Sequence, residues 1–206
     1  MEISRDNRSF IVRGVDKMKY FKKLVGDRIY LSPRSIEDAE IFVKWLNDFE
    51  VTDFTGRSSA IMDIESEKEY LLTKKDNNVV FAIVRFDNDE MIGSIDLKDI
   101  NHINRRATLG IMIGEAENRE KGYGTEAINL MLDYGFNYLN LMSINLDVAE
   151  FNERGIACYK KCGFKETGRR RKNIFLNGKY YDRLLMDILR EEFDSKGKNY
   201  IRNKNI

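Results

Sequence analysis

The stretch that decides the fold is Ile-Met-Ile-Gly at positions 111–114, followed by Arg-Glu-Lys-Gly-Tyr-Gly-Thr at positions 119–125. The apolar run predicts a buried strand, and the two glycines predict a turn that opens a helix through Leu139. A helix N-terminus carries free backbone N–H groups and a partial positive charge, so this turn suits a pyrophosphate. Gly122 and Gly124 have no Cβ, which lets a ligand approach the main chain closely. Because a short Arg-x-x-Gly-x-Gly also occurs in plain turns, its context decides the interpretation.

Length and composition set the broad class. A chain of 206 residues with 42% hydrophobic content has room for one ordinary core. Lys and Arg total 35 and Asp and Glu total 34, so no global field favours a nucleic acid or an anionic membrane. No apolar run approaches the ~20 residues that span a bilayer, and no signal-peptide segment is evident. We therefore expect a soluble, cytoplasmic protein with neither nucleic acid nor membrane as a partner.

One domain is expected, at residues 18–193. Residues 1–17 are polar and aperiodic, which indicates an N-terminal extension. The Lys/Asn-rich tail at residues 194–206 is expected to fray. No internal repeat and no low-complexity linker marks a second domain.

The cysteines do not indicate a metal site. Cys158 and Cys162 lie four positions apart on a predicted helix, and the chain contains one histidine. A zinc site needs more ligands than this arrangement supplies. Reduced thiols and no bound metal are therefore expected, in keeping with a cytoplasmic protein.

The hydrophobic pattern along the chain predicts the order βααβββαβαββ. Strands are expected at residues 28–31, 79–86, 91–97, 106–113, 143–149, 164–168 and 180–189. Helices are expected at residues 35–47, 64–75, 122–139 and 152–162. Ser35 and Asp38 form a capping box for the first helix, and Asn177-Gly178 predicts the last hairpin turn. The fold class is α/β (α+β), with a mixed, mostly antiparallel sheet of six to seven strands and helices on both faces.

A second group of polar residues lies on the helix expected at 152–162. Asn152 and Tyr159 are seven positions apart, almost two turns, so they share one face about 10 Å apart along the axis. Asn152 is also well placed as an N-cap, and Tyr159 as a half-buried aromatic, so each has a purely structural alternative. Beside the glycine loop, a binding role is favoured for both.

These motifs resemble the acetyl-CoA-binding half of the GCN5-related N-acetyltransferases, the GNAT superfamily. The resemblance runs over residues 28–189 and is sharpest over residues 91–189. Segments at residues 100–106, 133–141 and 175–180 are similar to the branch that contains bacterial spermidine N-acetyltransferases and ribosomal-protein N-terminal acetyltransferases. The resemblance implies the GNAT acyl-CoA N-acyltransferase fold and acetyl transfer from acetyl-CoA, as cosubstrate, to a primary amine. Direct attack in a ternary complex, without a metal, is the implied mechanism.

The resemblance also implies roles for individual residues. The main chain of Ile111, Met112 and Ile113 would pair with the pantetheine arm as an added strand, and the Ile113 N–H would bind the oxyanion. Asn152 would hydrogen-bond the arm, and Tyr159 would protonate the departing CoA thiolate. The backbone groups that would hold the pyrophosphate belong to Arg119, Glu120, Lys121, Gly122, Tyr123, Gly124 and Thr125.

The general base stays open at this point. Many family members carry a carboxylate on the strand before the glycine loop, but residues 107–113 contain none. Asp96 and Asp99 on the preceding strand are the nearest candidates, acting through water, and Asp96 is the leading one. A solvent-facing position for Asp96 and a turn position for Asp99 are the alternatives. His102 titrates near neutrality, but its loop position favours a structural or interface role.

The acceptor and the assembly are also open. In the spermidine branch the segment after the first helix resembles Glu-Glu-Pro, whereas residues 56–59 read Gly-Arg-Ser-Ser here. A polyamine needs carboxylates to face it, so this departure weakens the case for spermidine; a protein N-terminus or a small amine are other acceptors. The alternative function is a non-catalytic acyl-CoA-binding or regulatory module. Exposed strands and the loop at residues 100–106 make a homodimer or a higher homo-oligomer the expected assembly.

Overall fold

The computed structural model describes residues 19–73, 76–194 and 200–201. The extension expected at residues 1–17, and all of the expected tail except residues 194 and 200–201, lie outside the described residues. Within that tail, Tyr200 and Ile201 donate their backbone N–H groups to Oδ2 of Asp133 at 2.9 and 3.2 Å. These two residues therefore pack against the domain instead of fraying.

The described strands form one sheet of eight, in the order β1-β2-β3-β4-β5-β6-β8-β7. The strands are β1 (Leu24–Val25), β2 (Ile29–Pro33), β3 (Val79–Arg85), β4 (Met91–Asn101), β5 (Arg106–Ile113), β6 (Ser143–Ala149), β7 (Lys165–Leu176) and β8 (Lys179–Leu189). Every neighbouring pair is antiparallel except β5 and β6, which confirms a mixed, mostly antiparallel sheet. The expected count of six to seven strands was wrong, because the missed strand β1 has only 2 residues and shows no periodicity.

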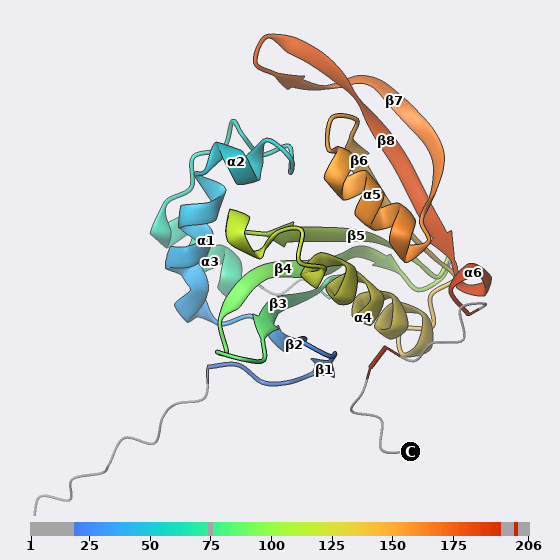
Figure 1. Cartoon of the computed structure of the whole chain (residues 1–206), viewed down its shortest axis with the longest axis horizontal. Coiled ribbons are helices and arrows are strands. Elements are labelled where there is room, and N and C mark those ends of the chain that lie inside the picture. Colours follow the sequence, from blue (N-terminus) through green and yellow to red (C-terminus); the bar gives the residue numbers. More distant parts are fainter. Residues whose placement is uncertain (1–18, 74–75, 195–199, 202–206) are drawn as a thin grey trace, which may run out of the picture.

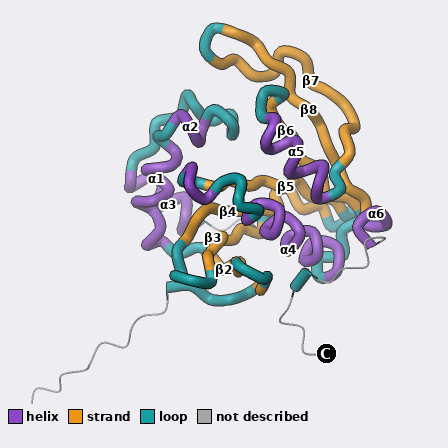
Figure 2. The backbone as a smooth tube through the Cα atoms, viewed as in Figure 1, coloured by secondary structure: helices purple, strands orange, loops and turns teal. Residues whose placement is uncertain are grey.

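Helices flank the sheet on both sides (Figures 1 and 2). The helical elements are two 3₁₀ turns (Ile36–Asp38 and Ala116–Asn118), α1 (Ala39–Leu46), α2 (Phe49–Thr52), α3 (Ile64–Leu72), α4 (Tyr123–Asn137), α5 (Glu153–Cys162) and α6 (Arg190–Asp194). The predicted capping box between Ser35 and Asp38 is present. The helix expected to reach residue 75 ends at Leu72, and residues 74–75 lie outside the described ranges. In the described part of the chain, no helix is long and apolar enough to cross a membrane.

Successive side chains along each strand point to opposite faces of the sheet, so a separate hydrophobic core forms on each face. On β2, Ile29 and Leu31 pack toward α4, whereas Tyr30 packs toward Phe42 and Trp45 of α1. The same alternation continues along β3, so both faces of the central strands are buried. The expected covering of both faces is thereby confirmed.

The last two strands form a long hairpin that extends beyond the rest of the molecule (Figure 1). Its turn contains Asn177 and Gly178, with φ values of 49° and 78°. Two consecutive positive φ angles are typical of the tight turn that Asn-Gly predicts. Strand β7 is longer than the segment expected at residues 164–168, because its exposed outer residues lack an apolar alternation.

The feature of the sheet that positions the site is a split between β5 and β6. These parallel strands pair only at Arg106–Ser143, Ala107–Ile144 and Thr108–Asn145. From Leu109 onward β5 continues beside β4 but has no partner on its other side. An unpaired strand edge therefore lies in the middle of the sheet.

Gly114, at the end of that edge, is expected to be intolerant of any side chain. A Cβ at this position would lie 1.9 Å from Cε2 of Trp45, which is itself 1% exposed. Gly114→Ala should lower the free energy of unfolding by about 1–3 kcal/mol, because a rigid buried ring must move. Urea denaturation measures the change. Gly168→Ala is the control, since its nearest contact would be 3.7 Å away, and equal midpoints for the two variants would contradict the expectation.

Candidate active site

A cavity of about 720 Å³ occupies the split between β5 and β6. One side of it is lined from α4, α5 and the loop before α4, including Gly122, Gly124 and Tyr159. The other side is lined from the segment between β2 and α3, from α3 and from β4, including Glu67 and Asp96. The cavity therefore connects the two faces of the sheet.

The loop before α4 presents free backbone donors to this cavity. Glu120 and Gly122 have φ values of 60° and 84°, and Gly122 is the N-cap of α4 without a side-chain cap. The first N–H groups of a helix have no intrahelical acceptor, so those of Tyr123, Gly124 and Thr125 are available to an anion. The helix dipole adds a partial positive charge at the same place.

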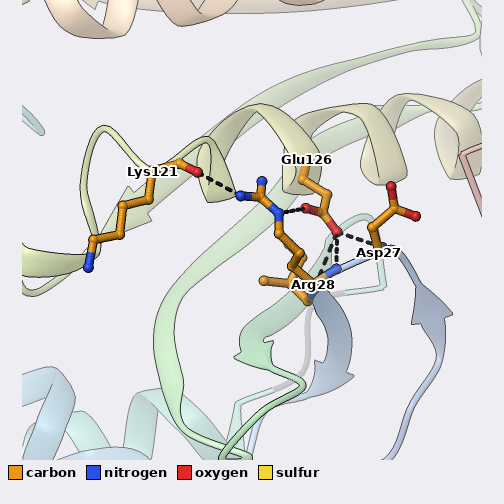
Figure 3. A network of polar contacts seen from close by, with 5 residues as sticks. Asp27, Arg28, Lys121 and Glu126 are labelled. Atoms are coloured by element: carbon orange, nitrogen blue, oxygen red, sulfur yellow. Dashed lines mark hydrogen bonds and ion pairs between the residues drawn. The ribbon is translucent and has the colours of Figure 1, made fainter.

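A network of charged hydrogen bonds around Arg28 and Glu126, which we call the brace, holds this loop in place (Figure 3). Arg28 donates from Nη1 to the Lys121 carbonyl at 2.8 Å and from Nε to Glu126 at 3.0 Å. Glu126 also accepts from the backbone N–H groups of Asp27 and Arg28 at 2.7 and 2.8 Å. A Cβ on Gly122 would lie 3.1 Å from the Arg28 guanidinium. The brace therefore fixes the peptide next to the N-cap, and sequence reasoning missed it because its partners are some 90 residues apart.

The free edge of β5 supplies a row of main-chain groups. The Gly114 N–H donates to Ile92 of β4 at 3.0 Å. Because successive residues of a strand point their N–H and C=O groups to opposite sides, those of Ile113 and Ile111 point into the split. An extended ligand arm can pair with them as an added strand does.

Helix α5 brings Asn152 and Tyr159 to the same cavity. Asn152 Oδ1 accepts from the Gly155 N–H at 2.9 Å, so the residue is the N-cap and its Nδ2 is left for a ligand. Tyr159 packs edge-on against Phe164 with ring centroids 6.0 Å apart. Burial raises the pKa of the Tyr159 hydroxyl, and negative charge at Cys158, Cys162 or Asp147 would raise it further.

Cys158 lies beside the first turn of α4. Its Sγ is 3.3 Å from Oγ1 of Thr125, and both cysteines are free thiols. A hydrogen bond from Cys162 lowers the pKa of Cys158 to about 6, with burial opposing this shift. Within the described ranges, no group of three or more His, Cys, Asp and Glu residues is arranged to hold a metal ion.

Asp96 is the carboxylate nearest the free edge. It pairs across the strands with Gly110, where a Cβ would lie 2.5 Å from Asp96 Oδ1. Its Oδ2 lies 3.2 Å from Lys98 Nζ, whereas its buried Oδ1 has no hydrogen-bond partner among the described residues. Burial raises the pKa of Asp96, with Lys98 opposing that shift. The alternative of a solvent-facing Asp96 was wrong, since its side chain is 14% exposed.

The other candidates for a base lie elsewhere. Asp99 is exposed and lies inside β4, at the register shift between Lys98 and Asn101, with a φ of 51°, so the structure does not place it in a turn. His102 is exposed in the turn between β4 and β5. Neither residue lines the cavity.

Most of the residues proposed from sequence line the cavity. They are Asp96, Ile111, Met112, Ile113, Arg119, Glu120, Gly122, Gly124, Thr125, Asn152 and Tyr159. Lys121 and Tyr123 do not: the Lys121 carbonyl faces Arg28, and the Tyr123 ring lies 5.0 Å from the Arg28 guanidinium carbon.

Sequence reasoning missed several lining side chains. Glu67 of α3 is 1% exposed, and its Oε2 has no hydrogen-bond partner among the described residues. Asn118 is 2% exposed, and neither of its amide atoms has such a partner. An acidic residue on a largely polar helix reads as solvated, so only the tertiary structure identifies Glu67. Asn118 directly precedes Arg119, so extending the glycine motif by one residue would have included it.

A family model described as an acetyltransferase (GNAT) domain matches residues 28–165. The chain belongs to this family. It is 36% identical over 129 residues to the spermidine N(1)-acetyltransferase of Vibrio cholerae, covering 63% of this chain and 74% of that enzyme. It is 38% identical over 109 residues to the Escherichia coli K12 enzyme of the same name, covering 53% of this chain and 58% of that enzyme.

The solved structures support the same family assignment. The crystal structure of the Vibrio cholerae spermidine N-acetyltransferase in complex with CoA and spermine matches with a TM-score of 0.75 and 27% identity, covering 81% of this chain and 98% of that one. Membership of the GNAT family confirms the predicted fold and an acetyltransferase activity that uses acetyl-CoA. The alternative function, a non-catalytic acyl-CoA-binding or regulatory module, finds no support in these comparisons.

Loss of the brace is expected to weaken cosubstrate binding more than turnover. Arg28→Gln should raise KM for acetyl-CoA about tenfold, because charge-assisted bonds that order the loop are lost. The kcat at saturation should stay within about twofold, since the reacting groups are untouched. Steady-state kinetics with Arg106→Gln as the control, an exposed arginine outside the cavity, measures both quantities. An unchanged KM with a reduced kcat would contradict this role.

Proposed function

We propose that this chain transfers the acetyl group of acetyl-CoA directly to a primary amine, with Tyr159 as the general acid and Asp96 as the general base. The observation that carries the proposal is that both side chains line one cavity through the split in the sheet. One comes from the α5 face and the other from the opposite face. Cosubstrate and acceptor can therefore meet from opposite sides.

The cosubstrate is proposed to bind along the α4 side. The N-terminus of α4 takes the pyrophosphate, and the free edge at Ile111 and Ile113 pairs with the pantetheine arm. Asn152 Nδ2 donates to the same arm from α5. Free backbone donors, an unpaired strand edge and a cavity beside them support this placement.

The reaction then needs two proton transfers. The amine nitrogen attacks the thioester carbonyl and forms a C–N bond, and its surplus proton passes to Asp96, directly or through a water molecule. The Ile113 N–H donates to the oxyanion. The C–S bond then breaks, and the CoA sulfur takes the proton of Tyr159, which leaves an amide and free CoA. Tyrosine regains its proton from solvent.

The environments of the two groups suit these roles. Burial raises the pKa of Tyr159, so its hydroxyl stays protonated near neutral pH until the thiolate forms beside it. Burial also raises the pKa of Asp96, which makes its carboxylate a stronger base for the proton that the attacking amine loses. The unpartnered Oδ1 of Asp96 is free to accept the proton.

A primary amine is the proposed acceptor class, and the relatives make a polyamine one candidate within it. The similar enzymes of Vibrio cholerae and Escherichia coli are named for spermidine, and the similar Vibrio cholerae structure contains spermine. A homodimer, a cytoplasmic location and a single catalytic domain at residues 18–193 remain proposals.

Tyr159→Phe should lower kcat by about 10²–10⁴-fold, because general acid catalysis is lost while the ring and its packing stay. The KM for acetyl-CoA should change little. Release of free CoA thiol over a panel of amines measures turnover. Tyr180→Phe serves as the control, since it removes an exposed hydroxyl outside the cavity. Unchanged turnover in Tyr159→Phe would remove the assigned acid.

Asp96→Asn should lower kcat by about 10²-fold and flatten the acid limb of its pH profile. A base acts only when ionised, so wild-type kcat should rise with pH through the raised pKa of Asp96. Asp99→Asn, three positions along the chain and outside the cavity, is the matched control. An acid limb that persists in Asp96→Asn would assign the base elsewhere.

A further inference from the structure

The acceptor side of the cavity contains as many cations as carboxylates. We use the name acceptor end for the charged lining residues of the segment between β2 and α3, of α3 itself and of β4. They are Arg34, Glu50, Arg57, Glu67, Asp96 and Lys98. Three cations among six charged groups make this an unusual surface for a polycation to enter.

The two arginines of the acceptor end are not held in ion pairs with carboxylates of the described residues. The Arg34 guanidinium lies 5.1 Å from the centre of the Tyr70 ring, which orients it without neutralising it. Arg57 is exposed on the loop after α2. Within the described part of the chain, neither arginine forms an ion pair, although both act electrostatically on Glu67 and Asp96.

The carboxylates of the acceptor end are also incompletely satisfied. Glu67 Oε2 and Asp96 Oδ1 are buried, and neither has a hydrogen-bond partner among the described residues. An unmade hydrogen bond at a buried oxygen costs free energy, and an incoming N–H group removes this cost. The acceptor end thus holds unpaired guanidinium groups next to unsatisfied carboxylate oxygens.

We infer that the acceptor carries an anionic group, a carboxylate or a phosphate, close to the amine that is acetylated. The anion binds to Arg34 and Arg57, whose planar donors match either group. The amine binds at Glu67 and Asp96, next to the thioester. This inference rests on the proposed function and narrows its acceptor class.

A polyamine fits this arrangement less well. One nitrogen of a polyamine can reach Asp96, but its remaining ammonium groups would lie near Arg34, Arg57 and Lys98. Like charges at short range in a partly buried site repel strongly.

Matched acceptors test the inference. Short ω-amino carboxylates are each compared with their own amides, and O-phosphoethanolamine is compared with ethanolamine; spermidine is the polycation. With acetyl-CoA saturating, release of CoA thiol gives kcat/KM for each amine. The anionic member of a pair should exceed its neutral partner about tenfold or more. The carboxylate and phosphate arms identify which anion is preferred.

Two variants tie the preference to the acceptor end. Arg57→Gln should remove most of the advantage in kcat/KM of the anionic acceptor over its neutral partner, because only the anionic acceptor makes a direct contact with this guanidinium. Arg34→Gln should act in the same direction. Arg171→Gln, an exposed arginine of β7 outside the cavity, should leave the ratio unchanged.

Binding separates this inference from the proposed chemistry. Calorimetric titration of the protein saturated with CoA measures the affinity for each amine without turnover. A binding preference without acetylation of any amine would overturn the proposed chemistry and support the inference. Acetylation of spermidine or of the neutral partners as efficiently as of the anionic amines would overturn the inference and support the chemistry. No preference in either measurement overturns the inference.

Discussion

The early end of the pairing between β5 and β6 is the constraint on which the site depends. Three residue pairs hold the two strands together, and beyond Thr108 they separate. A strand edge in the middle of a sheet normally has to be paired or covered, because unsatisfied backbone groups are costly. Here the edge opens onto a cavity that crosses the sheet. One deviation from regular pairing therefore provides both hydrogen-bonding groups for an extended cosubstrate and a passage to the opposite face.

The loop before α4 is useful only if its backbone is held in place. The positive φ angle of Glu120 carries an energetic cost, which surrounding contacts must offset, whereas Gly122 adopts its positive φ without that cost. The brace of Arg28 and Glu126 supplies those contacts and ties the turn between β1 and β2 to the first turn of α4 (Figure 3). The N-terminal strands thus contribute to a site that they do not line. This dependence explains why the glycine motif alone is a weak signal in a sequence.

Local patterns were enough to predict much of the fold and many of the cavity-lining residues that are proposed to bind the cosubstrate. Apolar periodicity predicts the central strands and α4, and the Asn177-Gly178 pair predicts the last hairpin. The strand β1 and the short helix α2 escape such patterns, because 2 and 4 residues contain too few periods. Glu67 escapes for another reason. Burial of a charged side chain on α3 is decided by what packs above it, and no local pattern records that.

The two halves of the cavity use different kinds of interaction. This difference explains why the sequence indicates the cosubstrate but not the acceptor. The cosubstrate half relies on main-chain groups, whose positions follow from secondary structure and therefore from short motifs. The acceptor end relies on side chains from separate elements, such as Arg34, Glu67 and Asp96, brought together only by the tertiary fold. A shared fold consequently transfers the use of acetyl-CoA between relatives more securely than it transfers the acceptor. Arg57 lies on a loop outside the sheet, so a substitution there can change the local charge, and with it the acceptor preference, without disturbing the sheet.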